Sequence, residues 1–487
     1  MNAGPLGGLW VDRTGAVHVN RILPDGTRAE STASSRWFIW LNDRLPAELE
    51  TDAEVIKLAG DASFSHLVET ESLSEFDRIR KAVKGRVAAD IVRPLESQYL
   101  LQSRERLFSE VKFSELRRCQ LDIETASSGE GFSDPELPED RILAIGLRFG
   151  DRDRTLVLAE MSDAAERELL EALNSVLAEE DPDTIEGHNL FKFDLNFLRR
   201  RAKRLKVTCA WGRFGQPASF RNSRLKVAER WIDFPRCDLP GRTVVDTFLL
   251  VQLYDITTRE LLAFGLKDVA IHFGITPADG GDRTYIPGNR IHQAYDEDRE
   301  TFLAYLADDL RETKGIADRL LPTYFEQVKT FPITLQEATL RGTTGKIDLL
   351  FQEHYYHARQ SIPVPPPVSP FEGGYTRSFQ EGVFRHVLHF DVASLYPSLL
   401  LQIGRDPGND VLGVFIPLLQ QLREYRLKYK QLVRTAEPAE ERAEADARQA
   451  SFKILINSFY GYLGFSGARF GDGELAAEVT QKGRDLL

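Results

Sequence analysis

From Arg118 onwards the 487-residue chain alternates between strand-like and helix-like segments. RCQLDIET, RILAIGLRFG and TLVLAE are short apolar stretches separated by turn residues, which is typical of strands. SDAAERELLEALNSVLAEE is amphipathic with a Ser-Asp start, and TIEGHN leads directly into the helical segment FDLNFLRRRAKRL. This alternation predicts an α/β layer architecture. Residues 1 to about 110 instead mix short alternating stretches with acidic helical pieces, which predicts an α+β domain.

A proline-rich stretch divides the chain further on. IPVPPPVSP (362–370) predicts a stiff linker at a domain boundary, because each proline fixes φ and removes a hydrogen-bond donor. The segment FRHVLHFDVASLYPSLL after it predicts a buried strand that runs into a turn. Two helical segments, IPLLQQLREYRLKYKQLVR and ERAEADARQASFKILINSFYG, surround a short break and predict an antiparallel helical hairpin.

The composition is that of a globular protein, with 42% hydrophobic and 28% charged residues. Three scattered cysteines predict neither a disulfide framework nor a structural zinc site. The chain has no 18-residue apolar run and no signal-peptide pattern, so we expect a cytoplasmic protein without a membrane partner. The net charge of −12 argues weakly against nucleic-acid binding, but basic runs at 199–204 and 423–430 leave that possibility open.

Three separated segments carry acidic and polar residues in arrangements that suit metal binding. The residues are Asp122, Glu124, Asn189, Phe193, Asp194, Tyr305 and Asp309. The first two carboxylates are two positions apart on a strand and therefore share a face. Asp194 lies at the start of a helix, and Tyr305 and Asp309 are four apart on one helical face, a spacing that Asp308 lacks.

Hydrolysis of a phosphodiester by two divalent ions about 4 Å apart requires several converging carboxylates. Hard oxygen ligands suit Mg²⁺ or Mn²⁺, and a nearby tyrosine hydroxyl can orient the attacking water. Each segment also has an ordinary explanation, namely a common strand pattern, a helix cap or a solvated helix face. The order of all three along about 190 residues favours a catalytic site.

A second group of residues follows the proline-rich stretch. Asp391 comes directly after the mainly apolar residues 387–390, and a carboxylate at the end of a buried strand is costly unless it meets a cation. The turn after it exposes backbone N–H groups that suit a triphosphate, although a capping aspartate is the alternative. In KILINSFYG, Lys453, Asn457 and Tyr460 share one helical face, and Gly461 permits close approach of another backbone.

These ordered segments resemble family B DNA polymerases over residues 115–487, with three exonuclease motifs and polymerase motifs A (DVASLYPS) and B (KILINSFYG). The resemblance implies a ribonuclease-H-like 3′→5′ exonuclease domain and a partial palm with helical-hairpin fingers. It implies catalytic roles for Asp122, Glu124, Asp194, Tyr305, Asp309 and Asp391, all but the tyrosine as ligands of two Mg²⁺ or Mn²⁺ ions per active site. Asp246 in GRTVVDT fits a recurring family segment without a definite role.

The resemblance also implies substrate contacts. The residues expected to bind the nucleotide are Ser394, Leu395, Tyr396, Arg426, Lys430, Lys453, Asn457 and Tyr460. Tyr396 is expected to lie under the sugar and exclude a 2′-hydroxyl. DNA binding falls to Asn189, Phe193, Gly373, Gly374, Tyr375 and Gly461. The expected domains are an N-terminal domain (1–112), the exonuclease domain (113–330), a linker with the remainder of the N-terminal domain (331–385), the first palm part (386–412), the fingers (413–466) and a second palm part (467–487).

The implied function is a DNA-directed DNA polymerase with proofreading, whose partners are DNA primer-template, single-stranded 3′ ends and dNTPs. The only aspartates after Gly461 in this sequence are Asp472 and Asp485, and neither lies in the Asp-Thr-Asp context of motif C. We therefore expect little polymerase activity from this chain alone, as a truncated, split or degenerate polymerase. A second chain with motif C and thumb, and a sliding clamp, are conceivable partners. The alternatives are a stand-alone 3′→5′ exonuclease and an inactive DNA-binding scaffold.

Overall fold

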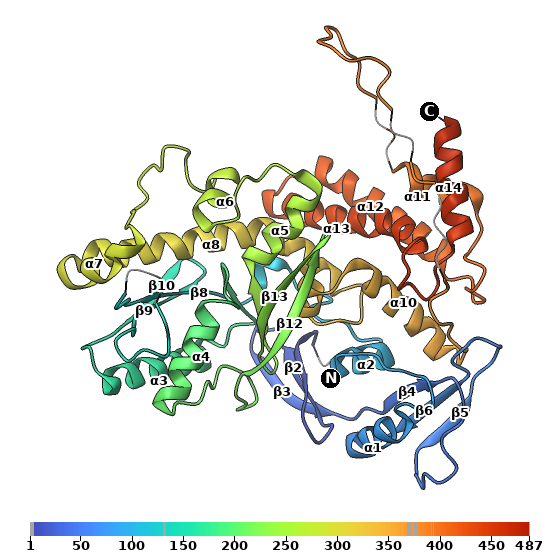
Figure 1. The fold of residues 1–487 in the computed structure, drawn as a ribbon, viewed down its shortest axis with the longest axis horizontal. Coiled ribbons are helices and arrows are strands. Elements are labelled where there is room, and N and C mark those ends of the chain that lie inside the picture. The colour runs from blue at the N-terminus through green and yellow to red at the C-terminus, as the bar shows by residue number, and fades with distance from the viewer. Residues whose placement is uncertain are drawn as a thin grey trace.

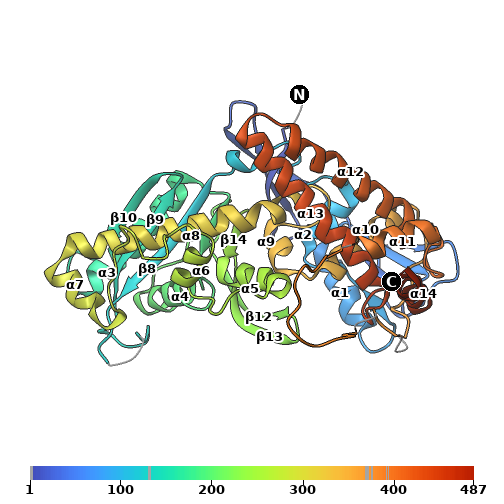
Figure 2. The same cartoon turned by 90° about the horizontal axis from the view of Figure 1, so that it is seen from above.

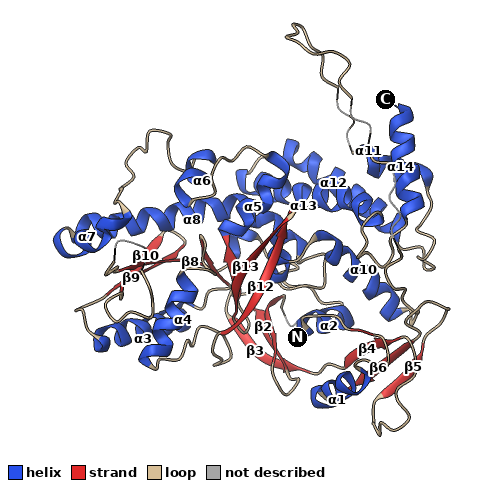
Figure 3. Ribbon diagram, viewed as in Figure 1, coloured by secondary structure: helices blue, strands red, loops and turns tan. Residues whose placement is uncertain are grey.

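The computed structural model describes residues 4–129, 133–367, 372–374, 377–390, 392 and 394–486 and has mixed α/β content (Figure 1). Its strands all lie between residues 6 and 246 of the described chain, and the C-terminal part is built of helices (Figure 3). The predicted α/β alternation and the predicted helical hairpin are both present. No helix in the described part of the chain has the length and apolar character needed to cross a bilayer.

The N-terminal region contains two antiparallel sheets and two helices. One sheet has the order β1-β2-β3 and the other β5-β6-β4-β7. The apolar run WFIWL forms β4, which is buried at every position because it lies between two neighbouring strands and contacts both helices. The elements are β1 (Leu6–Val11), β2 (Val17–Ile22), β3 (Arg28–Ala33), β4 (Trp37–Leu41), β5 (Glu54–Lys57), β6 (His66–Thr70), α1 (Leu73–Val83), β7 (Ala89–Asp90) and α2 (Leu95–Ser103).

A five-stranded sheet of order β10-β9-β8-β11-β14 forms the next layer. The strands β10, β9 and β8 are antiparallel, and β11 pairs in parallel with both β8 and β14. The strands β12 and β13 form a separate two-stranded sheet. In chain order, this region contains η1 (Phe113–Glu115), β8 (Arg118–Thr125), β9 (Ile142–Phe149), β10 (Arg152–Val157), α3 (Asp163–Glu180), β11 (Thr184–Gly187), α4 (Asp194–Leu205), β12 (Ser219–Val227), β13 (Arg230–Asp238), β14 (Thr243–Asp246), α5 (Thr247–Thr258), α6 (Leu266–His272), η2 (Gly288–Arg290), α7 (Ile291–Glu297) and α8 (Arg299–Gln327).

The long helix α8 crosses this sheet and contacts β8, β9 and β11 (Figures 1 and 2). Its approach depends on Gly146 of β9, because a Cβ at that position would stand 2.9 Å from carbon atoms of Leu306 and Leu310 on α8. Gly146 pairs directly with Asp122 of β8. The glycine therefore brings α8 close to the sheet at the strand position where the first carboxylate stands.

The C-terminal part consists of helices α9 (Leu335–Leu340), α10 (Thr343–His357), α11 (Leu395–Ile403), α12 (Phe415–Thr435), α13 (Ala439–Leu463) and α14 (Gly473–Leu486). The helices α12 and α13 run side by side as the predicted hairpin (Figure 2). The helix α13 also packs on α10, where the Tyr462 hydroxyl donates to Asp348 Oδ1 at 2.8 Å.

The prediction of a buried strand before Asp391 was wrong for the described residues. Residues 384–390 adopt no regular strand, and their apolar side chains face solvent, with Val387, Leu388 and Phe390 exposed by 72%, 80% and 84%. An isolated strand leaves its backbone groups without partners, and a sheet needs neighbouring strands to be stable. Within the described part of the chain, no strand lies beside this segment.

Candidate active site

Carboxylates from β8 and α8 meet above the five-stranded sheet. One oxygen each from Asp122, Glu124 and Asp309 lies within 4.8 Å of the others. The two-residue period of β8 places the first two side chains on the face that α8 covers, and Tyr305 and Asp309 lie on the same side of that helix. Two of the three sequence segments therefore converge at one point.

Asp194, from the remaining segment, contacts the strand that carries two of these carboxylates. It is the first residue of α4 and is 1% exposed, and its Oδ1 accepts a hydrogen bond of 3.1 Å from the backbone N–H of Ile123. Ile123 stands between the two carboxylate-bearing positions of β8. Asp194 thus fixes this part of the strand and raises the pKa of Asp122, without belonging to the three closest oxygens of the cluster.

Burial raises the pKa of the four carboxyl groups predicted to bind metal here. The pKa values of Asp122 and Glu124 lie well above their ordinary range, first because of burial and then because of the neighbouring acids. Burial raises the pKa of Asp194 to about 8 and that of Asp309 to about 6, although Arg283 and Lys267 counteract the rise at Asp309. A cation among these oxygens would favour their charged forms. The all-oxygen donor set fits a hard divalent ion.

Two basic residues that the sequence analysis missed complete the site. Lys267 Nζ on α6 donates a 2.9 Å hydrogen bond to the Tyr305 hydroxyl. Tyr305 in turn lowers the pKa of Asp309. Arg283 directs its guanidinium to Asp309 and to Glu312, with Nε 2.7 Å from Glu312 Oε1. No local pattern singles out either basic residue, because both reach α8 from the segment between β14 and that helix.

Asn189 and Asp246 shape the backbone that leads into α4. Asn189 has a left-handed backbone with φ of +63°, and its N–H donates to Asp246 Oδ1 at 3.0 Å. The other carboxylate oxygen of Asp246 accepts from the Phe191 N–H, also at 3.0 Å. Asp246, which had no assigned role, therefore connects the end of β14 to the loop before α4. Phe193 is the N-cap residue of α4, and its ring lies 5.9 Å from that of Phe197.

The residues with polymerase-like spacing gather around α11, α12 and α13. Arg426 Nη1 donates to Ser394 Oγ at 2.6 Å, and the rings of Tyr396 and Tyr460 lie 4.3 Å apart between centroids. Leu395, the first residue of α11, is partly buried. Exposed positions on the two hairpin helices hold Lys430, Lys453 and Asn457. Asp391 and Tyr375, expected to bind metal and DNA, lie outside the described residues.

The three glycines expected near DNA have different surroundings. Gly373 and Gly374 are exposed, and a Cβ on Gly374 would stand 2.7 Å from the Tyr396 hydroxyl. The carbonyl of Gly373 accepts a 2.8 Å hydrogen bond from Arg484 of α14. Gly461 has open space where a Cβ would point, so the described chain shows no close approach of another backbone there.

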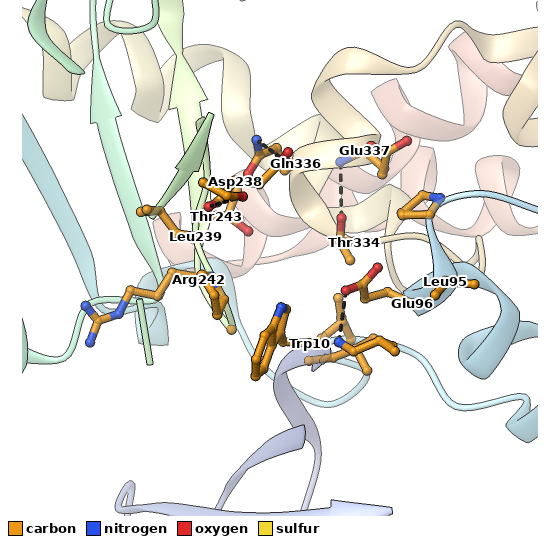
Figure 4. A pocket seen from close by; sticks show the side chains of 18 of the residues that line it. Trp10, Leu95, Glu96, Asp238, Leu239, Arg242, Thr243, Thr334, Gln336 and Glu337 are labelled. Carbon is orange, nitrogen blue, oxygen red and sulfur yellow. Dashed lines mark hydrogen bonds between the residues drawn. The ribbon is translucent and has the colours of Figure 1, made fainter. Parts of the chain in front are cut away.

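A cavity of about 640 Å³ lies elsewhere, between the N-terminal region, the β12–β13 hairpin and α9. Figure 4 shows Trp10, Glu96 and Thr334 around this space, with Asp238 and Arg242 on the other wall. Glu96 accepts a 3.0 Å hydrogen bond from the Val11 N–H, and burial raises the pKa of its carboxyl group. None of the carboxylates of the cluster above lines this cavity.

The fold is shared with a solved polymerase. The structure of the family B DNA polymerase from the hyperthermophilic archaeon Pyrobaculum calidifontis superposes with a TM-score of 0.76 at 20% sequence identity, covering 99% of this chain and 71% of that one. At this identity the likeness concerns the fold alone.

Sequence comparisons identify the family. Residues 95–258 match DNA polymerase family B, exonuclease domain, and residues 409–487 match DNA polymerase family B. A DNA polymerase from Archaeoglobus fulgidus is 27% identical over 430 residues, covering 83% of this chain and 51% of that protein. DNA polymerase 2 from Aeropyrum pernix is 27% identical over 408 residues, covering 76% and 47%. Two segments of the chain thus match family B DNA polymerase models, and the chain spans about half the length of the curated relatives it matches.

Proposed function

We propose that this chain removes nucleotides from single-stranded 3′ ends of DNA as the proofreading part of a family B DNA polymerase. The convergence of Asp122, Glu124 and Asp309 beside Tyr305 carries the proposal. The match of residues 95–258 to the family's exonuclease domain supports it. We assign the ribonuclease-H-like fold to the five-stranded sheet and its helices and keep the boundary of 113–330 for this domain.

In this proposal the three clustered carboxylates, with Asp194 in support, hold two Mg²⁺ or Mn²⁺ ions. Such ions activate water and stabilise negative charge on the phosphate during hydrolysis. The Tyr305 hydroxyl lies between Lys267 and Asp309, so its direction is set from both sides. We propose that the Tyr305 hydroxyl orients the attacking water. Asn189 and Phe193, at the entrance to α4, contact the DNA end.

The residues around the helical hairpin serve dNTP and primer-template binding in the complete polymerase. Arg426 and Lys453 suit phosphate groups because both are cationic. Arg426 contacts Ser394 beside α11, and Lys453 is exposed on α13. Tyr396 and Tyr460 form a tilted aromatic pair, which we assign to contacts with the sugar and base of the nucleotide. The remaining domain boundaries, and contact with a second chain or a sliding clamp, belong to this proposal.

A digestion assay with the purified chain tests the exonuclease proposal. A 5′-labelled single-stranded oligonucleotide should shorten from its 3′ end in Mg²⁺ or Mn²⁺ and stay intact in EDTA. Replacing Asp122 and Glu124 together by alanine should slow the reaction by on the order of 100-fold or more, because the ions lose ligands. Asp151→Ala, at a side chain that is 98% exposed, should digest like the unmodified chain.

The assay also separates the alternatives. Binding of the oligonucleotide without shortening in either metal would favour the inactive DNA-binding scaffold and end the exonuclease proposal. Full digestion by the Asp122→Ala, Glu124→Ala variant would show that the chemistry resides elsewhere. The result that we expect is a ladder of single-stranded products shortened from the 3′ end.

A further inference from the structure

The helical hairpin of α12 and α13 is attached unevenly to the rest of the molecule. The part of α13 after Ser451 contributes large side chains to the hydrophobic core, namely Phe452, Leu455, Ile456, Phe459, Tyr462 and Leu463. The preceding residues 441–450, which we call the outer segment, are all described by the structure, and among them only Ala445 is buried. Hydrophobic burial therefore fixes the C-terminal part of α13, whereas the outer segment depends on other contacts.

The outer segment lies against α8, and the two helices run side by side there (Figure 2). A cavity of about 440 Å³ lies beside this contact, with Ala443, Glu444 and Ala447 of α13 on one wall and Pro322 and Glu326 of α8 on another. Alanine side chains are too short to fill such a space. The outer segment and α8 therefore gain little from packing, because the walls of a cavity lack partner atoms.

Arg448 of the outer segment supplies a polar contact to α8. Its Nε donates to Glu326 Oε2 at 2.9 Å, and its other two nitrogens donate to Glu444 at 2.6 Å and to the Tyr429 hydroxyl at 3.2 Å. The guanidinium carbon also lies 5.1 Å from the centroid of the Tyr429 ring. Because Tyr429 belongs to α12, this arginine joins both hairpin helices at the point where they meet α8.

The two partners of this ion pair are held with different firmness. Glu326 is 6% exposed, and its other oxygen accepts a 2.7 Å hydrogen bond from Lys329, which also donates to the Val111 carbonyl at 2.8 Å. Arg448 keeps 25% of its side chain exposed. An ion pair with a solvated partner breaks at a modest cost in free energy. The carboxylate is therefore a fixed acceptor, and the arginine is a donor that water can replace.

We propose that Arg448 and Glu326 form a latch that holds the hairpin against α8, and that the outer part of the hairpin leaves α8 as a unit when this ion pair breaks. The residues after Ser451 stay in the core and provide the hinge. Arg426 of α12, which we assign to the nucleotide, donates to Ser394 Oγ beside α11 at 2.6 Å. The latch thus also determines where this cation stands relative to α11. The inference goes beyond the proposed exonuclease function and does not depend on it.

The distance between two spin labels measures the position of the hairpin in the full 487-residue chain. One nitroxide is attached to α12 through Gln431→Cys and the other to α3 through Glu171→Cys, at two exposed positions. Cys209→Ser removes the partly exposed native thiol, and Cys119 and Cys237 are buried away from the reagent. Double electron–electron resonance then gives the fractions of docked and undocked hairpin.

We expect a dominant docked distance in the unmodified chain. Glu326→Gln should raise the ratio of undocked to docked hairpin by about tenfold, the effect of one lost hydrogen bond between charged groups. Arg448→Met should give a similar rise, and it leaves Glu326 paired with Lys329. The double variant should rise no further, because either change already removes the same ion pair. Glu424→Gln, at an exposed glutamate of α12 that accepts from Gln420 at 3.1 Å, should leave the distances unchanged.

Each outcome decides for or against the latch. Unchanged distances in both single variants would overturn it. A double variant whose ratio rises by the product of the two single effects would also overturn it, because the two residues would then act independently. If Glu326→Gln does not fold, Arg448→Met decides, since its side chain is partly exposed. No DNA is digested in this experiment, so a failure of the proposed exonuclease function would leave its result unaffected.

Discussion

His188 illustrates how a single buried side chain affects stability near the site. Its Nε2 donates to the Phe264 carbonyl at 2.8 Å, and its Nδ1 lies 2.9 Å from the Thr247 hydroxyl, so the ring joins β11 to α5 and the loop before α6. Burial lowers the pKa of His188 from 6.5 to about 4. The folded chain therefore holds a neutral imidazole at neutral pH.

Because this pKa is lower in the folded chain than in the unfolded chain, protonation favours unfolding. The contribution of neutral His188 to the free energy of unfolding is complete above pH 6.5. It falls by about 3 kcal/mol as the pH falls toward 4. Denaturant unfolding between pH 7 and 4.5 should show that the free energy of unfolding falls more steeply with pH in the unmodified chain than in His188→Gln. His292→Gln, at a histidine with 45% of its side chain exposed, should retain the steep loss. Equal slopes in all three proteins would contradict this account.

At the scale of elements, the site depends on how closely α8 approaches the sheet. The strand and helix periods of β8 and α8 are local, and this is why Asp122, Glu124, Tyr305 and Asp309 could be selected from the sequence. The contacts of Lys267 and Arg283 could not, because they depend on the path of a long connecting segment. For residues 384–390 the sequence predicted a buried strand that is absent from the structure. Apolar residues alone do not form a strand when no neighbouring strand pairs with them.

Gly146→Ala tests this close approach. The added Cβ would lie 2.9 Å from carbons of Leu306 and Leu310, so α8 must shift away from β9. We expect a loss of about 1–3 kcal/mol in the free energy of unfolding, as for other overpacked cores, and a lower exonuclease kcat because Asp309 moves with the helix. Thermal unfolding and digestion rates measure both effects. Gly473→Ala, where open space surrounds the new Cβ, should change neither. An unaltered kcat in Gly146→Ala would refute the proposed dependence.

At the scale of the whole molecule, α8 belongs to two regions at once. One part covers the carboxylate-bearing sheet, and the helix also packs on α13 of the helical hairpin (Figure 2). There Arg448 of α13 pairs with Glu326 of α8 at 2.9 Å and with Glu444 at 2.6 Å. The same helix thus supplies Asp309 to the carboxylate cluster and anchors the hairpin that carries Arg426, Lys453 and Tyr460, which we propose bind nucleotide.

The central claim is that the buried acids of β8 and α8 gather divalent cations. Manganese soaked into crystals of this chain, located by its anomalous scattering, measures this directly. We predict an anomalous peak within about 2.0–2.6 Å of oxygens of Asp122, Glu124 and Asp309, and its loss in the Asp122→Asn, Glu124→Gln variant. A folded, unmodified chain with no manganese beside these three carboxylates would contradict the account.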